Sequence, residues 1–126
     1  MSSSPLQGVR VLLVEDDEDT LELFALVLRE AGAEVRTAHD AKDAMRALLE
    51  WPPTIVVSDL GMPAVDGFTL LREIRSVQQQ VPAIAVTGMG RAKDREAALA
   101  GGFQAHVTKP LEPEALVAIV RQWSAR

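Results

Sequence analysis

Four short apolar runs of this chain each end in a polar side chain of the kind that phosphate and metal chemistry requires. In an open parallel sheet the carboxyl ends of the strands lie along one edge, and ligands bind at that edge. If the four runs are strands of such a sheet, side chains far apart in the sequence converge there. They are the carboxylates of Glu15, Asp16 and Asp59, the hydroxyl of Thr87 and the ammonium of Lys109. Together they predict a site for a divalent cation and a phosphoryl group.

Five consecutive acids follow the first apolar run, and they allow two interpretations. Acids are favoured at the positive end of a helix, which explains Glu18 and Asp19. Glu15 and Asp16 directly follow the run and are interpreted as site residues, whereas Asp17 could cap the next helix or face the site. Carboxylates within about 4 Å repel each other by about 4 kcal/mol at an effective dielectric constant of 20. A cation would offset that repulsion, and all-oxygen ligands favour Mg²⁺ or Mn²⁺.

Asp59 is the strongest single candidate, because it ends an apolar run and begins a loop rich in turn residues. A carboxylate in this position can ligate a metal and can also attack phosphorus to give an acyl phosphate. Thr87 precedes Gly88, which leaves room for an incoming group, and Lys109 supplies a positive charge for a phosphate. The Lys109–Pro110 bond is a candidate for the cis isomer, which X–Pro bonds tolerate.

The elements that must position these side chains alternate short β-branched runs with segments of helical period, which is typical of βα units on a parallel sheet. Five such units predict an α/β, flavodoxin-like, doubly wound fold of three layers with strand order 2-1-3-4-5. Asp40 is a candidate N-cap of the second helix. The strands are expected near residues 9–14, 34–38, 54–58, 83–86 and 104–108, and the helices near 18–31, 41–50, 66–77, 91–100 and 113–124.

Length and composition limit the number of domains, the chemistry and the location that we expect for this chain. A chain of 126 residues, 48% of them apolar, suits one globular domain, which we expect over residues 8–126 after a flexible tail at residues 1–7. The net charge of −5 and the lack of a basic cluster argue against direct nucleic acid binding. The chain has no Cys, which excludes disulfides and thiolate chemistry. It shows no signal peptide and no apolar run near the ~20 residues of a membrane helix, so we expect no membrane insertion and a cytoplasmic location.

Six short motifs occur in order along the chain: Val-Glu-Asp-Asp after the first strand, Ser58-Asp59, Met62-Pro63, Asp66-Gly67, Thr87-Gly88 and Lys109-Pro110. As a set they resemble the receiver domain of bacterial two-component response regulators, over nearly the whole chain. The resemblance implies that Asp59 is the phosphoacceptor. It would take a phosphoryl group from a phosphohistidine of a sensor histidine kinase or of a histidine phosphotransfer protein. The domain would then be a phosphoacceptor that assists its own phosphorylation and slow dephosphorylation, not a turnover enzyme.

The resemblance also implies how a Mg²⁺ (or Mn²⁺) ion would be held. Asp16 and Asp59 would bind the ion directly, together with the backbone carbonyl of Gly61. Glu15 would hold it through water. In-line phosphoryl transfer needs positioning and charge neutralisation more than covalent chemistry by side chains, which agrees with such an arrangement.

The same resemblance implies a switch. Thr87 and Lys109 would contact the phosphoryl oxygens, and movement of Thr87 would couple to residue 106 and to the surface of the fourth helix, fifth strand and fifth helix. This chain has His106 where the family usually has Tyr or Phe, so the switch is expected to be weakened or sensitive to pH. Gly61 and Met89 stand where the family tunes hydrolysis, and neither side chain can orient water. Slow loss of the phosphoryl group is therefore expected.

Other classes fit the sequence less well. A Mg²⁺-dependent phosphatase resembling the haloacid dehalogenases needs a second Asp two residues after its nucleophile, where this chain has Gly61. A nucleotide site needs a glycine-rich turn after the first strand, where this chain has acids. The remaining alternative is a receiver used only as a binding or dimerisation module, although no expected site residue is missing. Residues 102–116 also resemble receivers attached to hybrid sensor kinases. The sequence does not decide whether phosphorylation leads to a homodimer.

Overall fold

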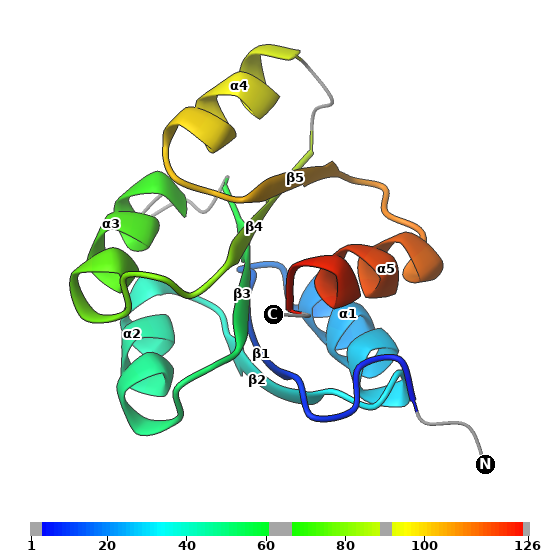
Figure 1. Ribbon diagram of the computed structural model, residues 1–126. Helices are drawn as coiled ribbons and strands as arrows, with labels where there is room; N and C mark the ends of the chain where they lie inside the picture. Colours follow the sequence, from blue (N-terminus) through cyan, green and yellow to red (C-terminus); the bar gives the residue numbers. More distant parts are fainter. Residues whose placement is uncertain (1–3, 61–66, 89–91, 125–126) are drawn as a thin grey trace.

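The computed structural model describes residues 4–60, 67–88 and 92–124. Five parallel strands form one sheet in the order β2-β1-β3-β4-β5, with helices on both faces (Figure 1). This confirms the flavodoxin-like, doubly wound fold and its strand order. The strands are β1 (Arg10–Val14), β2 (Glu34–Ala38), β3 (Ile55–Asp59), β4 (Ala83–Thr87) and β5 (Ala105–Thr108), and the helices are α1 (Glu18–Glu30), α2 (Ala41–Glu50), α3 (Gly67–Val77), α4 (Ala92–Ala100) and α5 (Pro113–Ser124).

Two apolar clusters hold the helices against the sheet. One includes Leu28 of α1 and Leu116 of α5 and covers one face; the other includes Leu48 of α2, Leu70 of α3 and Ala98 of α4 and covers the opposite face. Figure 1 shows α1 and α5 on one side of the sheet and α2 and α3 on the other. Every residue of β3 and β4 is buried, as expected for central strands of a parallel sheet that is covered on both faces. Among the described residues, no helix has the length and apolar character needed to span a bilayer.

Local signals in the sequence account for the helix ends. The Asp17 carboxylate accepts a hydrogen bond from the N–H of Thr20 (3.0 Å) and caps α1. The Asp40 carboxylate accepts one from the N–H of Asp43 (2.8 Å) and caps α2, as predicted. Each cap satisfies a helix N–H that would otherwise lack an intrahelical partner. Gly32 follows α1 with φ +104°, a conformation that favours glycine over other residues.

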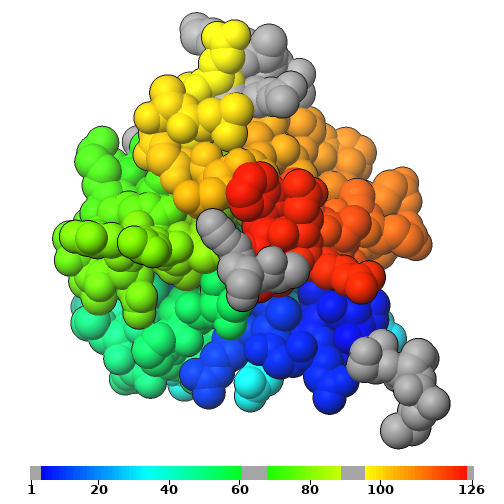
Figure 2. All heavy atoms as spheres, viewed as in Figure 1, coloured from blue at the N-terminus to red at the C-terminus, as the bar shows by residue number. Residues whose placement is uncertain are grey.

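The N-terminal segment packs against the domain. Leu6 is fully buried in the cluster formed by α1 and α5, and its N–H donates to the carbonyl of Ala31 (2.9 Å). Figure 2 shows this segment (blue) beside α5 (red). The sequence predicts a flexible tail over residues 1–7, whereas Leu6 belongs to the core in this structure. The signal is weak in the sequence, because a single Leu among polar residues gains its burial only from tertiary contacts.

Candidate functional site

The strand order brings the predicted site residues to one edge of the sheet. Glu15 directly follows β1, and Asp59 is the last residue of the neighbouring strand β3. Thr87 is the last residue of β4, next to β3 on its other side. Lys109 directly follows β5, and its N–H donates to the carbonyl of Thr87 (2.7 Å). Side chains up to 94 positions apart therefore meet at the carboxyl edge, as parallel pairing predicts.

Lys109 lies between two of the carboxylates. Its Nζ is 2.7 Å from Glu15 Oε1 and 3.8 Å from Asp59 Oδ2. The Lys109–Pro110 peptide bond is cis, which confirms the prediction for that bond. The sequence suggested Lys109 as a phosphate ligand, and its ion pair with Glu15 could not be predicted because it depends on side-chain conformation.

Three carboxylates form a group that suits one cation. Glu15, Asp16 and Asp59 each offer an oxygen, and these oxygens lie within 4.8 Å of one another. Glu15 is 2% exposed and Asp59 8%, while Asp16 is exposed and so opens the group to solvent. Three acids against one ammonium leave an excess of negative charge, and all donors are oxygens. This donor set fits Mg²⁺ or Mn²⁺.

The electrostatics of the pocket agree with that excess of acids. Burial raises the pKa of Glu15 to about 7, and the charge of Asp59 raises it further, although the hydrogen bond from Lys109 opposes the shift. Burial would lower the pKa of Lys109, but its hydrogen bond to Glu15 and the charges of Asp59 and Asp16 outweigh it, so the pKa rises. The shift of Glu15 is chiefly an effect of burial, whereas that of Lys109 comes from the acids around its ammonium. The pocket therefore favours added positive charge.

The sequence allowed Asp17 to be either a helix cap or a site residue, and in the structure it caps α1. The two hydrogen bonds from Thr20 lower the pKa of its exposed carboxyl, and its own N–H donates to Glu15 Oε2 (3.2 Å). Its backbone thus helps to orient Glu15, while its side chain belongs to the helix.

Thr87 and His106, the predicted switch pair, lie in direct contact. Thr87 Oγ1 is 2.9 Å from His106 Nε2; Thr87 is 7% exposed and His106 is half-buried. At Gly88, apart from its chain neighbours, a Cβ atom would meet nothing within 4 Å in the described part of the chain, so there is open space at this residue. A shallow groove lined by Thr20, Phe24, Gly88 and Lys109, among others, leads from α1 to this point. The groove therefore reaches Gly88, the residue next to Thr87, while Thr87 itself is buried and in contact with His106.

Several predicted positions lie outside the described residues. They are Gly61, Met62, Pro63, Asp66 and Met89. The predicted metal contact of the Gly61 carbonyl and the predicted effect of Gly61 and Met89 on hydrolysis stay predictions.

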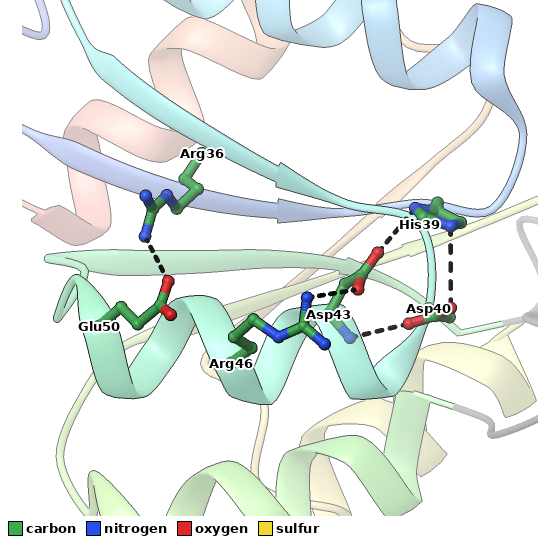
Figure 3. A network of polar contacts seen from close by, with 6 residues as sticks. All are labelled: Arg36, His39, Asp40, Asp43, Arg46 and Glu50. Carbon is green, nitrogen blue, oxygen red and sulfur yellow. Dashed lines mark hydrogen bonds and ion pairs between the residues drawn. The ribbon is translucent and has the colours of Figure 1, made fainter.

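A second group of titratable side chains stands at the start of α2, where His39, Asp40 and Asp43 lie close together (Figure 3). His39 Nδ1 is 2.9 Å from Asp43 Oδ2, and His39 Nε2 is 3.8 Å from Asp40 Oδ2. Asp40 also caps the helix, and Asp43 Oδ1 is 3.9 Å from a nitrogen of Arg46. His39, Asp40 and Asp43 each offer one ligand atom, and these atoms lie within 4.8 Å of one another. Helix capping and ion pairing account for this group.

A flavodoxin-like sheet with an acidic pocket and a lysine at its carboxyl edge defines a class of signalling domain that works through phosphorylation. The family model described as the response regulator receiver domain matches residues 11–121, and the chain belongs to that family.

Individual relatives agree with this assignment. The chain is 41% identical over 120 residues to an uncharacterized 14.6 kDa protein in the sodA1 3′ region of Leptolyngbya boryana, covering 94% of this chain and 92% of that protein. It is 36% identical over 112 residues to the transcriptional regulatory protein PrrA of Mycobacterium tuberculosis, covering 89% of this chain and 48% of PrrA. The chain thus spans about half the length of that regulator.

A solved structure is similar in both fold and sequence. The receiver domain of the sensor histidine kinase PA1611 from Pseudomonas aeruginosa PAO1 has a TM-score of 0.85 and 30% identity, over 94% of this chain and 99% of that one. That structure has a magnesium ion coordinated in its active site cleft.

Proposed function

We propose that this receiver domain is an active phosphoacceptor, with Asp59 taking a phosphoryl group from a phosphohistidine. The observation that carries the proposal is the meeting of Glu15, Asp59 and Lys109 at one sheet edge, with Nζ within 3.8 Å of both carboxylates. In the transfer, a carboxylate oxygen of Asp59 forms a bond to phosphorus as the bond from phosphorus to the histidine nitrogen breaks. The product is an acyl phosphate on Asp59.

Mg²⁺, or Mn²⁺ as the alternative, would supply the charge neutralisation that this step needs. Asp16 and Asp59 would bind the ion directly with the carbonyl of Gly61, and Glu15 would hold it through water. The oxygens of the three acids within 4.8 Å of one another support this assignment, as does the magnesium in the PA1611 receiver. An ion there would offset the mutual repulsion of the carboxylates and the negative charge of the incoming phosphoryl group.

Thr87 and Lys109 would contact the transferred group. The Lys109 ammonium lies 3.8 Å from Asp59 Oδ2. It would therefore be close enough to bind the oxygens of a phosphoryl group attached to Asp59. Thr87 would contribute its hydroxyl, and Gly88, the next residue, has open space where a Cβ would stand. Each such contact to an anionic oxygen is a charge-assisted hydrogen bond, which is stronger than one between neutral groups.

The partner that donates the phosphoryl group would be a sensor histidine kinase or a histidine phosphotransfer protein. The signal would leave through the surface of α4, β5 and α5, reached from Thr87 through His106. A phosphorylation-dependent homodimer on that surface is one form the output could take. We propose no direct contact with nucleic acid for this domain, because its net charge is −5.

Phosphorylation with acetyl phosphate tests the proposal without a kinase. The wild-type protein, Asp59→Asn and the control Asp40→Asn are incubated with acetyl phosphate and Mg²⁺ and measured by intact-mass spectrometry. We expect one phosphoryl group on the wild type and none on Asp59→Asn. Asp40→Asn should also gain one, because Asp40 caps α2 and lies outside the proposed site. The adduct should persist well beyond seconds in Mg²⁺ buffer.

The same experiment separates the active domain from a binding module. If the wild type gains no phosphoryl mass after rapid quenching and also fails to bind beryllofluoride, the acids have no chemical role. Interaction with a partner would then be the function to test. A phosphoryl group on Asp59→Asn would place the acceptor at another residue.

A further inference from the structure

An open groove of about 860 Å³ lies between α1 and α5, which are side by side in Figure 1. Its walls are mostly apolar: α1 contributes Val27 and Ala31, α5 contributes Val117 and Ala118, and the N-terminal segment contributes Pro5. None of the residues that line it belongs to the acidic pocket at the carboxyl edge. Contiguous apolar surface that is left open to water marks a place where another surface binds.

The apolar surface continues from the groove over the outside of α1. Leu23 and Leu26 are each 55% exposed, and with Val27 they stand at spacing i, i+3 and i+4 on one side of the helix. A single exposed leucine is ordinary in a soluble protein, but two in one stripe next to an open groove enlarge the apolar face. This face therefore spans three segments, which are the N-terminal segment, α1 and α5.

The stripe that α5 presents to the groove is complementary to itself. Its members are Glu114, Val117, Ala118 and Arg121, at spacing i, i+3, i+4 and i+7. A two-fold axis perpendicular to the helix, midway between Val117 and Ala118, would place a second copy of α5 antiparallel to the first. Glu114 of each copy would then face Arg121 of the other, because both residues are equally far from the axis. The small side chain of Ala118 would let the two helices approach closely.

Both charged ends of the stripe are available for such a contact. Glu114 and Arg121 are exposed, and in the part of the chain that the structure describes neither forms an ion pair. Exposed ion pairs add little affinity, but opposite charges across an interface set the register and disfavour the wrong one. The apolar groove would supply the affinity, and the two symmetric Glu–Arg pairs would align the copies.

We propose that this chain forms an isologous dimer through the face of α1 and α5, with a second copy of the chain as the occupant of the groove. A two-fold interface requires one patch that complements itself, and the charge order along α5 has that property. A different partner would not require this order. The proposal goes beyond phosphorylation: it needs neither Mg²⁺ nor a phosphoryl group, and it uses another face than that of α4, β5 and α5.

Sedimentation velocity tests the dimer on the unphosphorylated protein in EDTA. A stable interface buries about 1,200 Å² or more in total, and a face of two helices is near that limit, so we expect a dimer that forms with concentration between about 10 µM and about 0.5 mM. Ala118→Glu places a carboxylate beside the axis and should weaken the dimer at least about tenfold. Because Ala118 is exposed in the single chain, its fold should not change.

A matched control is Leu99→Glu, which adds the same charge to an exposed apolar position on α4. We expect this variant to dimerise like the wild type. A wild type that stays monomeric up to about 0.5 mM would overturn the proposal, and the groove would then be free for another partner. A dimer that Leu99→Glu dissociates and Ala118→Glu does not would place the interface on the other face and overturn it as well.

A charge exchange gives the sharpest test. Glu114→Arg has two arginines in the stripe and Arg121→Glu has two glutamates, so each variant alone should dimerise at least about tenfold more weakly than the wild type. In an equimolar mixture every arginine would face a glutamate, and we expect the dimer to return. A variant that is merely misfolded cannot be rescued by mixing. Single variants that dimerise like the wild type, or a mixture that stays monomeric, would overturn the proposal. Labelling of Asp59 by acetyl phosphate is measured separately, so the proposed function stands or fails independently.

Discussion

The ammonium of Lys109 lies closer to Glu15 than to Asp59, at 2.7 Å from Glu15 Oε1 against 3.8 Å from Asp59 Oδ2. Glu15 is nearly fully buried and Lys109 is about one quarter exposed, so their interaction is only partly screened by water. Without a cation in the pocket, Lys109 is the closest positive charge for both acids among the described residues. A bound metal ion and Lys109 would therefore both neutralise the negative charge of Glu15 and Asp59.

Replacement of Lys109 should separate metal binding from phosphorylation. In Lys109→Met we expect Mg²⁺ to bind about three- to tenfold more tightly, because a neighbouring positive charge is removed. Labelling of Asp59 by acetyl phosphate should decrease strongly, because the phosphoryl oxygens lose a ligand. Calorimetric titration with Mg²⁺ and intact mass measure the two effects, with the exposed Lys42→Met as control. Weaker Mg²⁺ binding in Lys109→Met would contradict this account.

The raised pKa of Glu15 should make the metal-free protein less stable as the pH rises. The pKa of this carboxyl is 4.5 in the unfolded chain and about 7 in the folded one, chiefly through burial. Between these values the folded state binds more protons than the unfolded state, so stability falls with rising pH and levels off above pH 7. Glu15→Gln removes this dependence. We expect the stability of the wild type relative to Glu15→Gln to fall by about 1–3 kcal/mol from pH 5 to pH 8.

Urea unfolding in EDTA at pH 5, 6, 7 and 8 measures that difference. A difference that is constant over this range would mean that Glu15 is ionised at pH 5 and held so by Lys109. A difference that grows in favour of the wild type would reverse the sign of the argument.

Most of the fold could be predicted because its signals are local or periodic. The runs that became β3 and β4 are apolar up to their last one or two residues, which is typical of strands buried on both faces, and their predicted bounds are within one residue of those observed. The burial of Leu6 could not be predicted in this way. It depends on where α1 and α5 pack, and no local pattern records that contact.

The site could be predicted only as far as backbone topology determines it. The convergence of Asp59, Thr87 and Lys109 follows from parallel strands ending at one edge. The side-chain partners do not follow from topology: the pairing of Lys109 with Glu15 and the choice of Asp17 as a cap depend on rotamers and on competing hydrogen bonds.

The two capping aspartates should matter for stability and not for chemistry. Asp17→Ala and Asp40→Ala each remove a side-chain acceptor at the start of a helix, and we expect each to cost about 1 kcal/mol of unfolding free energy. Both variants should still be labelled by acetyl phosphate. Urea unfolding and intact mass report the two properties on the same samples. A folded Asp17→Ala that has lost Mg²⁺-dependent labelling would instead place this carboxylate in the metal site.

Truncation of Leu6 should destabilise the whole domain, although this residue stands before the first strand. The side chain is fully buried against the cluster of α1 and α5, and its N–H is bonded to Ala31. A buried Leu→Ala change costs about 2–5 kcal/mol, so we expect Leu6→Ala in the lower half of that range because it lies near a chain end. Leu49→Ala is the matched control, since that side chain is 66% exposed and should change stability by less than about 0.5 kcal/mol. If Leu6→Ala unfolds at the same urea concentration as the wild type, the segment before β1 does not contribute to the core in solution.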